Sequence, residues 1–389
     1  MRFLNAGESH GPCLTGIIEG LPSGLEVTGE QINNQLERRQ RGYGRGGRMS
    51  IEKDEITFLS GLRFNRTIGS PLTLQIKNRD WENWCKLMAP EGICPSEVKA
   101  VTRPRPGHAD LAGGLKYNHQ DLRLVLERSS ARETAMRVAV GTVGRIIMEH
   151  FNLKIFSHVA AIGAVNSPVN PEDLPALFEK VENSPLRCAD AQAEAVMSEE
   201  VDRAKAEGDT LGGLIELVIT GVPPGLGSHV HWDRRFDGRL GGALFSIQGI
   251  KGVEIGAGFA SAGKRGSQVH DPLAVNHKTG IWRPSNRAGG IEGGITNGEP
   301  LIIRLAMKPI PTLSCPLPSV DLNTGQDASG ALERSDICAV PSAAVVAEAV
   351  AAWELAAAFM EKFGGDCMQE LEQSFRSYMD TVNSRLRKK

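Results

Sequence analysis

Two histidines sit on loops whose neighbours favour proton transfer. His10 follows Ser9 in the glycine-framed segment 7–11 (GESHG), and His108 lies in the proline-stiffened segment 103–110 (RPRPGHAD). A hydroxyl beside an imidazole on a bent loop can form a proton-transfer pair, and the prolines restrict the second loop. An ordinary polar turn and a structural histidine are the alternatives. The first segment is not a nucleophile elbow, because its serine lies between Glu and His rather than in GxSxG.

A second pattern is a tract of arginines and glycines. Segment 38–48 (RRQRGYGRGGR) holds five arginines and no acidic residue. Glycines let the backbone bend, so that several guanidiniums can converge on one anion. A solvated basic loop and an RNA-binding tract of the Arg/Gly type are the alternatives. We favour a multi-arginine pocket for a small polyanion, because there is a single tract and it is embedded between ordered-looking segments.

Three further loops carry anion-binding residues. Segment 128–132 (RSSAR) is expected at a helix N-terminus, where free amides and the helix dipole attract anions. Segment 308–312 (KPIPT) directly follows a predicted strand, and segment 334–336 (RSD) precedes an alanine-rich helix. An Arg and an Asp two residues apart could bind an anion and relay a proton, although surface pairing is the simpler alternative. Together these loops indicate an enzyme for a small, multiply anionic substrate, without revealing the reaction.

The elements that must position these loops can be predicted from periodicity and capping. Capping-box patterns at Thr28–Gln31 and Ser130–Glu133 predict helices 28–41 and 130–151. Other helices are expected over 173–181, 192–206, 342–363 and 366–386, and strands over 14–19, 71–77, 153–165, 211–221 and 301–307. Helices 130–151 and 342–363 are apolar on most sides and hence buried. Two buried helices among many strands predict an α+β fold with helices between sheets.

Composition narrows the class of protein. The 389 residues are 41% hydrophobic and 23% charged, with a formal net charge of -2, which argues against a dedicated nucleic-acid binder. The seven cysteines have no metal-type spacing, so we expect reduced thiols, no metal and a cytoplasmic location. The N-terminus lacks the apolar core of a signal peptide. The apolar stretch 343–360 is interrupted by Glu348 and Glu354, which predicts a buried helix and no membrane span.

Several longer segments of the sequence resemble those of a known protein family. The sequence resembles the chorismate synthase family in the segments 7–22 (GESHGPCLTGIIEGLP), 38–49 (RRQRGYGRGGRM), 105–111 (RPGHADL), 127–134 (ERSSARET), 246–256 (SIQGIKGVEIG), 289–298 (GGIEGGITNG), 308–312 (KPIPT) and 334–336 (RSD). The resemblance runs from residue 1 to about 363. It implies one domain over residues 1–365, followed by a helical tail over 366–389.

The resemblance also implies a fold and a reaction. The family fold is a β-α-β sandwich with central helices between two antiparallel sheets and internal pseudosymmetry, assembled as a homotetramer. The family converts 5-enolpyruvylshikimate 3-phosphate to chorismate and phosphate by 1,4-anti elimination, in aromatic amino acid biosynthesis by the shikimate pathway. The reaction requires reduced FMN, which some members obtain from an external flavin reductase and others from NADPH. A bacterial-like length favours external reduction.

Residue roles carry over from the same strings. Catalytic roles fall on Ser9, His10, His108 and Asp336: His10 protonates the leaving phosphate, His108 manages flavin protonation, and Ser9 with Asp336 relays a proton from the flavin. The implied substrate clamp is Arg39, Arg45, Arg48, Arg105, Arg132 and Arg334. The implied FMN contacts are Arg128, Ser129, Ser130, Gln248, Gly249, Gly293, Lys308, Pro309, Ile310, Pro311, Thr312 and Arg334. An RNA-binding protein that uses Arg38–Arg48 is the competing hypothesis.

Overall fold

Two antiparallel sheets form the outer layers of a sandwich. The computed structural model describes residues 1–46, 53–170, 173–276, 280–333 and 335–386. The first sheet has the order β1-β2-β6-β3, from β1 (Arg2–Ala6), β2 (Cys13–Glu19), β3 (Ile56–Ser60) and β6 (Leu72–Lys77). The second has the order β10-β15-β9-β7-β8, from β7 (Lys154–Ile162), β8 (Val165–Asn166), β9 (Gly213–Thr220), β10 (Ile250–Ile255) and β15 (Leu301–Met307).

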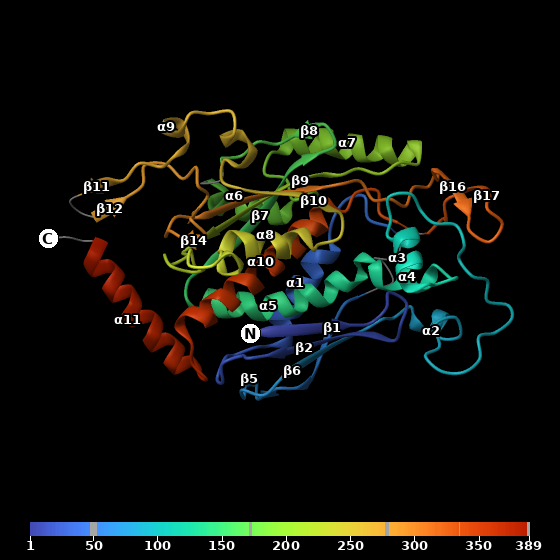
Figure 1. The fold of residues 1–389 in the computed structure, drawn as a ribbon, viewed down its shortest axis with the longest axis horizontal. Helices are drawn as coiled ribbons and strands as arrows, with labels where there is room; N and C mark the ends of the chain where they lie inside the picture. Colours follow the sequence, from blue (N-terminus) through green and yellow to red (C-terminus); the bar gives the residue numbers. More distant parts are fainter. Residues whose placement is uncertain (47–52, 171–172, 277–279, 334, 387–389) are drawn as a thin grey trace.

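Four helices fill the space between the sheets (Figure 1). Helices α1 (Gly29–Gln40) and α5 (Thr134–His150) contact the first sheet, whereas α8 (Phe236–Phe245) and α10 (Val340–Phe363) contact the second. Helices α5 and α10 cross closely, because a Cβ on Gly141 would lie only 2.2 Å from the carbonyl oxygen of Ala349. One hydrophobic cluster extends from the inner face of one sheet to that of the other. The expected α+β sandwich is therefore confirmed.

The two halves of the chain repeat one topology. Each half runs strand, strand, helix, strand, strand, helix: β1, β2, α1, β3, β6 and α5 in the first, then β7, β9, α8, β10, β15 and α10 in the second. Within each sheet the four strands follow the same spatial order, first-second-fourth-third. This correspondence is the internal pseudosymmetry that the family resemblance implied.

Most predicted elements lie within a few residues of their observed positions. The Thr28 capping box forms as predicted, with Thr28 and Gln31 satisfying each other's backbone amides. The second capping box is wrong. Ser130 instead caps a short 3-10 turn over Ala131–Glu133 by accepting from the Arg132 amide, and the Glu133 carboxylate binds other side chains. The segment predicted as one strand over 153–165 is a hairpin, because the chain turns between β7 and β8.

Smaller elements surround the sandwich. Helices α6 (Leu174–Asn183) and α7 (Ala191–Glu207) contact β7 and β8 of the second sheet. The remaining short helices and strands are α2 (Trp81–Trp84), α3 (Asp110–Tyr117), α4 (Arg123–Ser129), α9 (Gly266–Val269), β4 (Leu62–Arg63), β5 (Arg66–Thr67), β11 (Ala274–Asn276), β12 (Gly280–Trp282), β13 (Ile291–Glu292), β14 (Ile295–Thr296), β16 (Pro318–Asp321) and β17 (Gln326–Ser329), with 3-10 turns at Trp232–Arg234 and Gly258–Ser261.

The two C-terminal helices pack in different ways. Among the described residues, α10 alone is long and apolar enough to cross a membrane, but 83% of its apolar window is buried inside the protein, as expected for a core helix. Helix α11 (Met368–Leu386) buries Met368 and Leu371, and its Phe375 ring packs against Phe359 and Phe363 of α10. The first half of the expected tail is thus attached to the core.

Candidate active site

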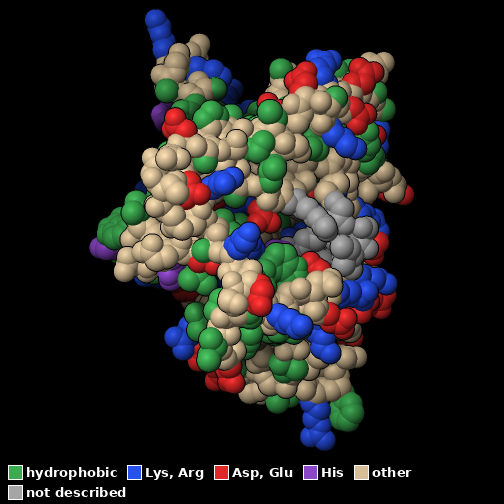
Figure 2. Space-filling view, turned by 90° about the vertical axis from the view of Figure 1, so that its right-hand side faces the viewer, with side chains coloured by type: hydrophobic (Ala, Val, Ile, Leu, Met, Phe, Trp, Pro, Cys, Tyr) green, Lys and Arg blue, Asp and Glu red, His purple; other side chains and the backbone are tan. Residues whose placement is uncertain are grey.

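The chemistry-bearing loops gather at one end of the sandwich. The loop after β1, helices α3 and α4, and the β16–β17 hairpin lie together on the right of Figure 1. Figure 2 looks at this end and shows a hollow bordered by basic and acidic side chains, partly beside atoms that are drawn in grey. Three clusters of polar residues, described in turn below, make up the candidate site.

The first cluster fixes His10. The Nδ1 atom of His10 lies 2.8 Å from Oε1 of Glu127, and its backbone amide donates to Oε2 of the same carboxylate at 2.7 Å. The imidazole stacks on Trp84, with ring centroids 3.9 Å apart. Ser9 is buried, its Oγ lies 3.0 Å from Oγ of Ser130, and its amide donates to the Glu127 carbonyl. The side chain of His10 is 12% exposed and that of Glu127 is 1% exposed, so Glu127 lies behind the histidine.

The second cluster brings arginines around the buried Asp54. Nη1 of Arg132 lies 2.5 Å from Oδ1 of Asp54, and Nη1 of Arg39 lies 3.6 Å from Oδ2. Burial lowers the pKa of Arg39 to about 10; Asp54 opposes this shift, whereas Arg45 and Arg132 add to it. Nε of Arg132 donates to Asn78. These guanidiniums are thus held close to one another, which costs free energy and suits an anionic ligand.

Asn78 connects this cluster to the histidine loop. Its amide nitrogen donates to the carbonyls of Glu8 and Gly11, on both sides of Ser9 and His10. Asn78 therefore holds the loop and Arg132 in one fixed relation.

Arg45 and Asp336 join the second cluster from opposite ends of the chain. Nη1 of Arg45 lies 2.8 Å from Oδ2 of Asp336, and the amide of Gly46 donates to Oδ1 at 2.6 Å. The backbone of Gly44 also pairs with Ile337. Two other members of the predicted clamp, Arg48 and Arg334, lie outside the described residues.

The third cluster is built around Asp110 at the start of α3. Its carboxylate accepts from Nδ1 of His108 at 2.5 Å and from Nε of Arg105 at 2.8 Å. Burial raises the pKa of Asp110, but hydrogen bonds and charges of His108 and Arg105 outweigh this effect and hold it well below its usual range. Arg105 also donates to Oγ1 of Thr312, so this cluster reaches the loop after β15.

The residues predicted to bind FMN occupy two regions. Arg128 donates to the carbonyls of Gly7 and Asn5, Ser129 to the Val125 carbonyl, and Nζ of Lys308 to the Gly107 carbonyl at 2.5 Å. These contacts connect segments 128–130 and 308–312 to the loops of His10 and His108. Pro311 lies beside Gly107, and the Ile310 carbonyl accepts from Thr210. Pro309 lies between these contacts in the same loop.

Gln248 and Gly249 extend this region, whereas Gly293 does not. Nε2 of Gln248 donates to Glu133, whose other oxygen binds Asn5, and the Gly249 carbonyl accepts from the Lys308 amide. Gly293 lies in the β13–β14 turn and lines a separate cavity with His270. The described contacts therefore do not bring Gly293 to the other predicted FMN contacts.

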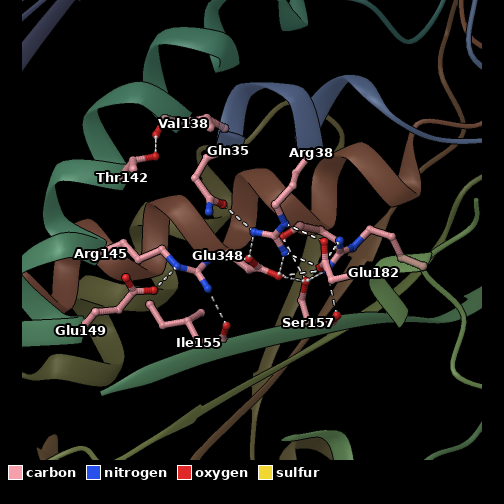
Figure 3. Close-up of polar contacts among 12 residues, drawn as sticks. Gln35, Arg38, Val138, Thr142, Arg145, Glu149, Ile155, Ser157, Glu182 and Glu348 are labelled. Atoms are coloured by element: carbon pink, nitrogen blue, oxygen red, sulfur yellow. Dashed lines mark hydrogen bonds and ion pairs between the residues drawn. The ribbon is translucent and has the colours of Figure 1, made fainter. Parts of the chain in front are cut away.

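The arginine tract does not act as one unit. Arg38 points away from the site into a buried network around Glu348 (Figure 3), where Nη1 of Arg38 lies 2.8 Å from the Glu348 carboxylate. Arg41 is exposed and pairs with Glu37. Only Arg39 and Arg45, among the described arginines of this tract, reach the site. This division disfavours an RNA-binding tract, whose arginines would face solvent.

Several site residues escaped the sequence analysis. Glu127, Asp54, Asn78, Asp110 and Trp84 hold the predicted residues in place, yet none was singled out. Glu127 and Asp110 lie inside the recognised strings 127–134 and 105–111, which was the available signal. Asp54, Asn78 and Trp84 carry no local signal, because the site residues that they contact are more than ten residues away in sequence.

The arrangement suits acid–base chemistry on an anion. It combines two histidines, each paired with a buried carboxylate, with a set of buried guanidiniums. No group of three or more metal-ligating side chains occurs in the part of the chain that the structure describes. The paired histidines and the guanidiniums can themselves supply proton transfer within a cationic site.

Comparisons with known proteins agree with this reading. The family model "Chorismate synthase" matches residues 1–360. A chorismate synthase of Desulforamulus reducens is 57% identical over 383 residues, covering 98% of this chain and 99% of the relative, and one of Desulforudis audaxviator is 56% identical, covering 99% and 98%. A solved structure described as a crystal structure of chorismate synthase has a TM-score of 0.79 and 44% identity, and covers 98% of both chains.

Proposed function

This chain belongs to the chorismate synthase family and is a lyase that forms chorismate. We propose that the three polar clusters at one end of the sandwich carry out the elimination of phosphate from 5-enolpyruvylshikimate 3-phosphate. The gathering of both histidines, each paired with a carboxylate, beside the buried arginines is the observation that carries the proposal. The RNA-binding alternative has no support among the relatives.

The arginines supply the substrate clamp. The substrate carries two carboxylates and one phosphate, and burying such charge unpaired would be prohibitive. Arg39, Arg45 and Arg132 provide converging guanidiniums on one side, and Arg105 provides another beside His108. We assign Arg48 and Arg334 to the same clamp. Bound phosphate and carboxylates would relieve the repulsion that the clustered cations impose on one another.

The two histidines divide the proton transfers. His10 donates a proton to the phosphate oxygen as the carbon–oxygen bond breaks and its electrons leave with phosphate. His108 is held by Asp110 and Arg105 beside the segment 308–312, and there controls the protonation of the cofactor. Ser9 and Asp336 would relay a proton away from the bound flavin, as the family resemblance implies.

Residues of this chain fit a reduced flavin mononucleotide. Gln248 has a buried Oε1 without a hydrogen-bond partner in the described structure. This oxygen could accept a hydrogen bond from an N–H group of the flavin ring. Arg128 and Lys308 provide cations for a phosphate, and Ser129, Ser130 and Thr312 provide hydroxyls. Gly249 has φ +83°, a conformation that other residues rarely adopt, and a Cβ there would lie only 3.1 Å from the Met307 side chain. When bound, reduced flavin supplies an electron-rich ring whose transient electron donation assists loss of phosphate.

The working form of the enzyme is proposed from the family. We assign it a cytoplasmic location and a homotetrameric assembly, which would allow another subunit to bring its Gly293 to a flavin site. The chain carries no dedicated nucleic-acid partner in this proposal. Reduced FMN comes from an external flavin reductase, rather than from NADPH bound by this chain.

A phosphate-release assay tests the proposal. Enolpyruvylshikimate phosphate and chemically reduced FMN are added without oxygen, and phosphate and chorismate are measured together. Equal release of both products, dependent on reduced FMN, is expected. Absence of chorismate under these conditions would refute the assigned reaction. When NADPH and oxidised FMN replace reduced FMN in the same assay, no product is expected. Product under those conditions would show that the chain reduces its own flavin.

A further inference from the structure

We propose that Glu127 and Trp84 are the positioning residues of His10: Glu127 fixes the proton on Nδ1, and Trp84 fixes the ring plane, so that Nε2 delivers the proton to the departing phosphate. This inference rests on the proposed role of His10.

The Glu127 carboxylate holds both the backbone and the ring of His10. Oε2 accepts from the His10 amide at 2.7 Å, and Oε1 lies 2.8 Å from Nδ1. An ionised carboxylate can only accept hydrogen bonds, so Nδ1 must be the donor. In the neutral imidazole the single proton is then on Nδ1, and Nε2 is the nitrogen that gains and loses the second proton.

The two side chains of the Glu127–His10 pair differ in burial. Glu127 is 1% exposed and His10 is 12% exposed, so the carboxylate lies in the protein and the imidazole lies towards the pocket. When Nε2 gives up its proton, the proton passes to a phosphate oxygen, and the Nδ1–H bond to Glu127 remains. Glu127 therefore exchanges no proton; it stabilises the charged imidazolium before the transfer and keeps the ring oriented after it.

Trp84 adds the second constraint. Its ring lies at 21° to the imidazole with centroids 3.9 Å apart, and Arg123 stands 5.2 Å from the Trp84 ring. Nη1 of Arg123 lies 3.8 Å from Glu127, and Nη2 lies 3.8 Å from Glu333. Among the described residues, the charged groups near the Glu127–His10 pair include Arg123 on α4, Glu333 before α10, and Glu8 beside His10 in the same loop. Stacking on an indole favours a cation and limits rotation of the ring.

The same arrangement recurs at the other histidine. Nδ1 of His108 faces the buried carboxylate of Asp110 at 2.5 Å, as Nδ1 of His10 faces Glu127. The likeness is limited to this contact of Nδ1 with a buried acid, because Nη2 of Arg105 also lies 3.2 Å from Nε2 of His108. A surface pair provides a contrast: Glu372 contacts Nε2 of His150, and both side chains are more than 40% exposed.

Glu127→Gln tests the electrostatic part of the proposal. The variant keeps the shape of the side chain but removes its charge. We expect kcat to fall about 10-fold to 100-fold, because a hydrogen bond to a charged group is worth about 1.5–3 kcal/mol. The affinity for substrate and FMN should change less than about threefold. Loss of the negative neighbour disfavours the imidazolium, so the decline of kcat at high pH should begin at a lower pH than in the wild type. Glu372→Gln is the matched control and should leave the kinetics unchanged.

Two further variants and one measurement keep the proposal open to refutation. Trp84→Phe should retain most activity, whereas Trp84→Ala should lower kcat about 10-fold. Nitrogen NMR of the wild-type protein should place the neutral His10 proton on Nδ1, and this measurement decides the matter even if Glu127→Gln does not fold. A proton on Nε2, or a normal pH profile in folded Glu127→Gln, would overturn the proposal. If His10→Ala itself retained full turnover, the role of His10 in the proposed function would fail instead.

Discussion

The buried network around Glu348 offers the sharpest test of what holds the sandwich together. Glu348 is 1% exposed at the middle of α10 and pairs with Arg38 of α1, Arg145 of α5 and Arg187 before α7 (Figure 3). Its carboxylate also accepts from Ser157 of β7 at 2.5 Å. One side chain thus connects three helices, a loop and a sheet. Glu348→Gln removes its charge while it keeps its volume.

The loss of stability in Glu348→Gln follows from the three arginines that would lose their carboxylate partner. Burial raises the pKa of Glu348, but the three arginines outweigh it and hold the pKa well below its usual range. Breaking a buried pair leaves an uncompensated charge and costs about 3–5 kcal/mol. Glu182 still pairs with Arg38 and Arg187 after the substitution, which keeps the expected loss within that range. We therefore expect the free energy of unfolding in urea at pH 7 to fall by about 3–5 kcal/mol.

The pH dependence provides a second readout. A group whose pKa is lowered by folding contributes stability above its unfolded value, near 4, and this contribution is lost as the pH falls through the folded value. The difference between wild type and Glu348→Gln should therefore be largest near neutral pH and shrink below about pH 4. Glu149→Gln is the control: Glu149 pairs with Arg145 but is 51% exposed, so its loss should cost at most about 1 kcal/mol. Equal stability of Glu348→Gln and wild type would refute the reasoning.

Variants at four other positions test the site and the core. Arg45→Ala should weaken substrate binding by about 2–5 kcal/mol in calorimetry while FMN binding changes little, and Arg45→Lys should rescue it only partly; unchanged affinity would remove Arg45 from the clamp. His108→Ala should lower turnover about 10²–10⁴-fold and alter the absorption spectrum of bound reduced FMN, and near-normal turnover would exclude it from the chemistry. Gly141→Ala should cost about 1–3 kcal/mol in urea unfolding, because its Cβ would clash with the Ala349 backbone. Gly242→Ala on α8, where nothing lies within 4 Å, should instead be neutral or stabilising.

The fold was predictable where one short segment determines its own structure. Thr28 and Gln31 form the capping box that their spacing indicates, and the strand predicted over 301–307 coincides with β15. Strand β1 was missed because its residues alternate little in polarity, and its partner β2 defines it. The pairing of distant strands into a repeated first-second-fourth-third order is a property of the whole chain, so no single segment predicts it.

The candidate site shows the same limit. Motif residues such as His10, Arg105 and Arg132 could be named from the sequence, but not the carboxylates that orient them. Asp54 is 78 positions away from Arg132, and Glu127 is 117 positions away from His10. Such partners are selected by tertiary packing, since a buried guanidinium or imidazolium requires an acceptor wherever the fold brings one.

Helical geometry explains why the arginine tract divides between the core and the site. Consecutive residues of an α-helix point about 100° apart, so neighbours in sequence face different parts of the protein. At the end of α1, Arg38 reaches Glu348 in the core, whereas Arg39 reaches Asp54 and the Ala131 carbonyl in the site. Once the helix has ended, Arg45 can fold back towards Asp336. A run of like charges therefore does not measure the charge of a pocket. In this tract one arginine stabilises the sandwich, and the next one contributes to the pocket at its end.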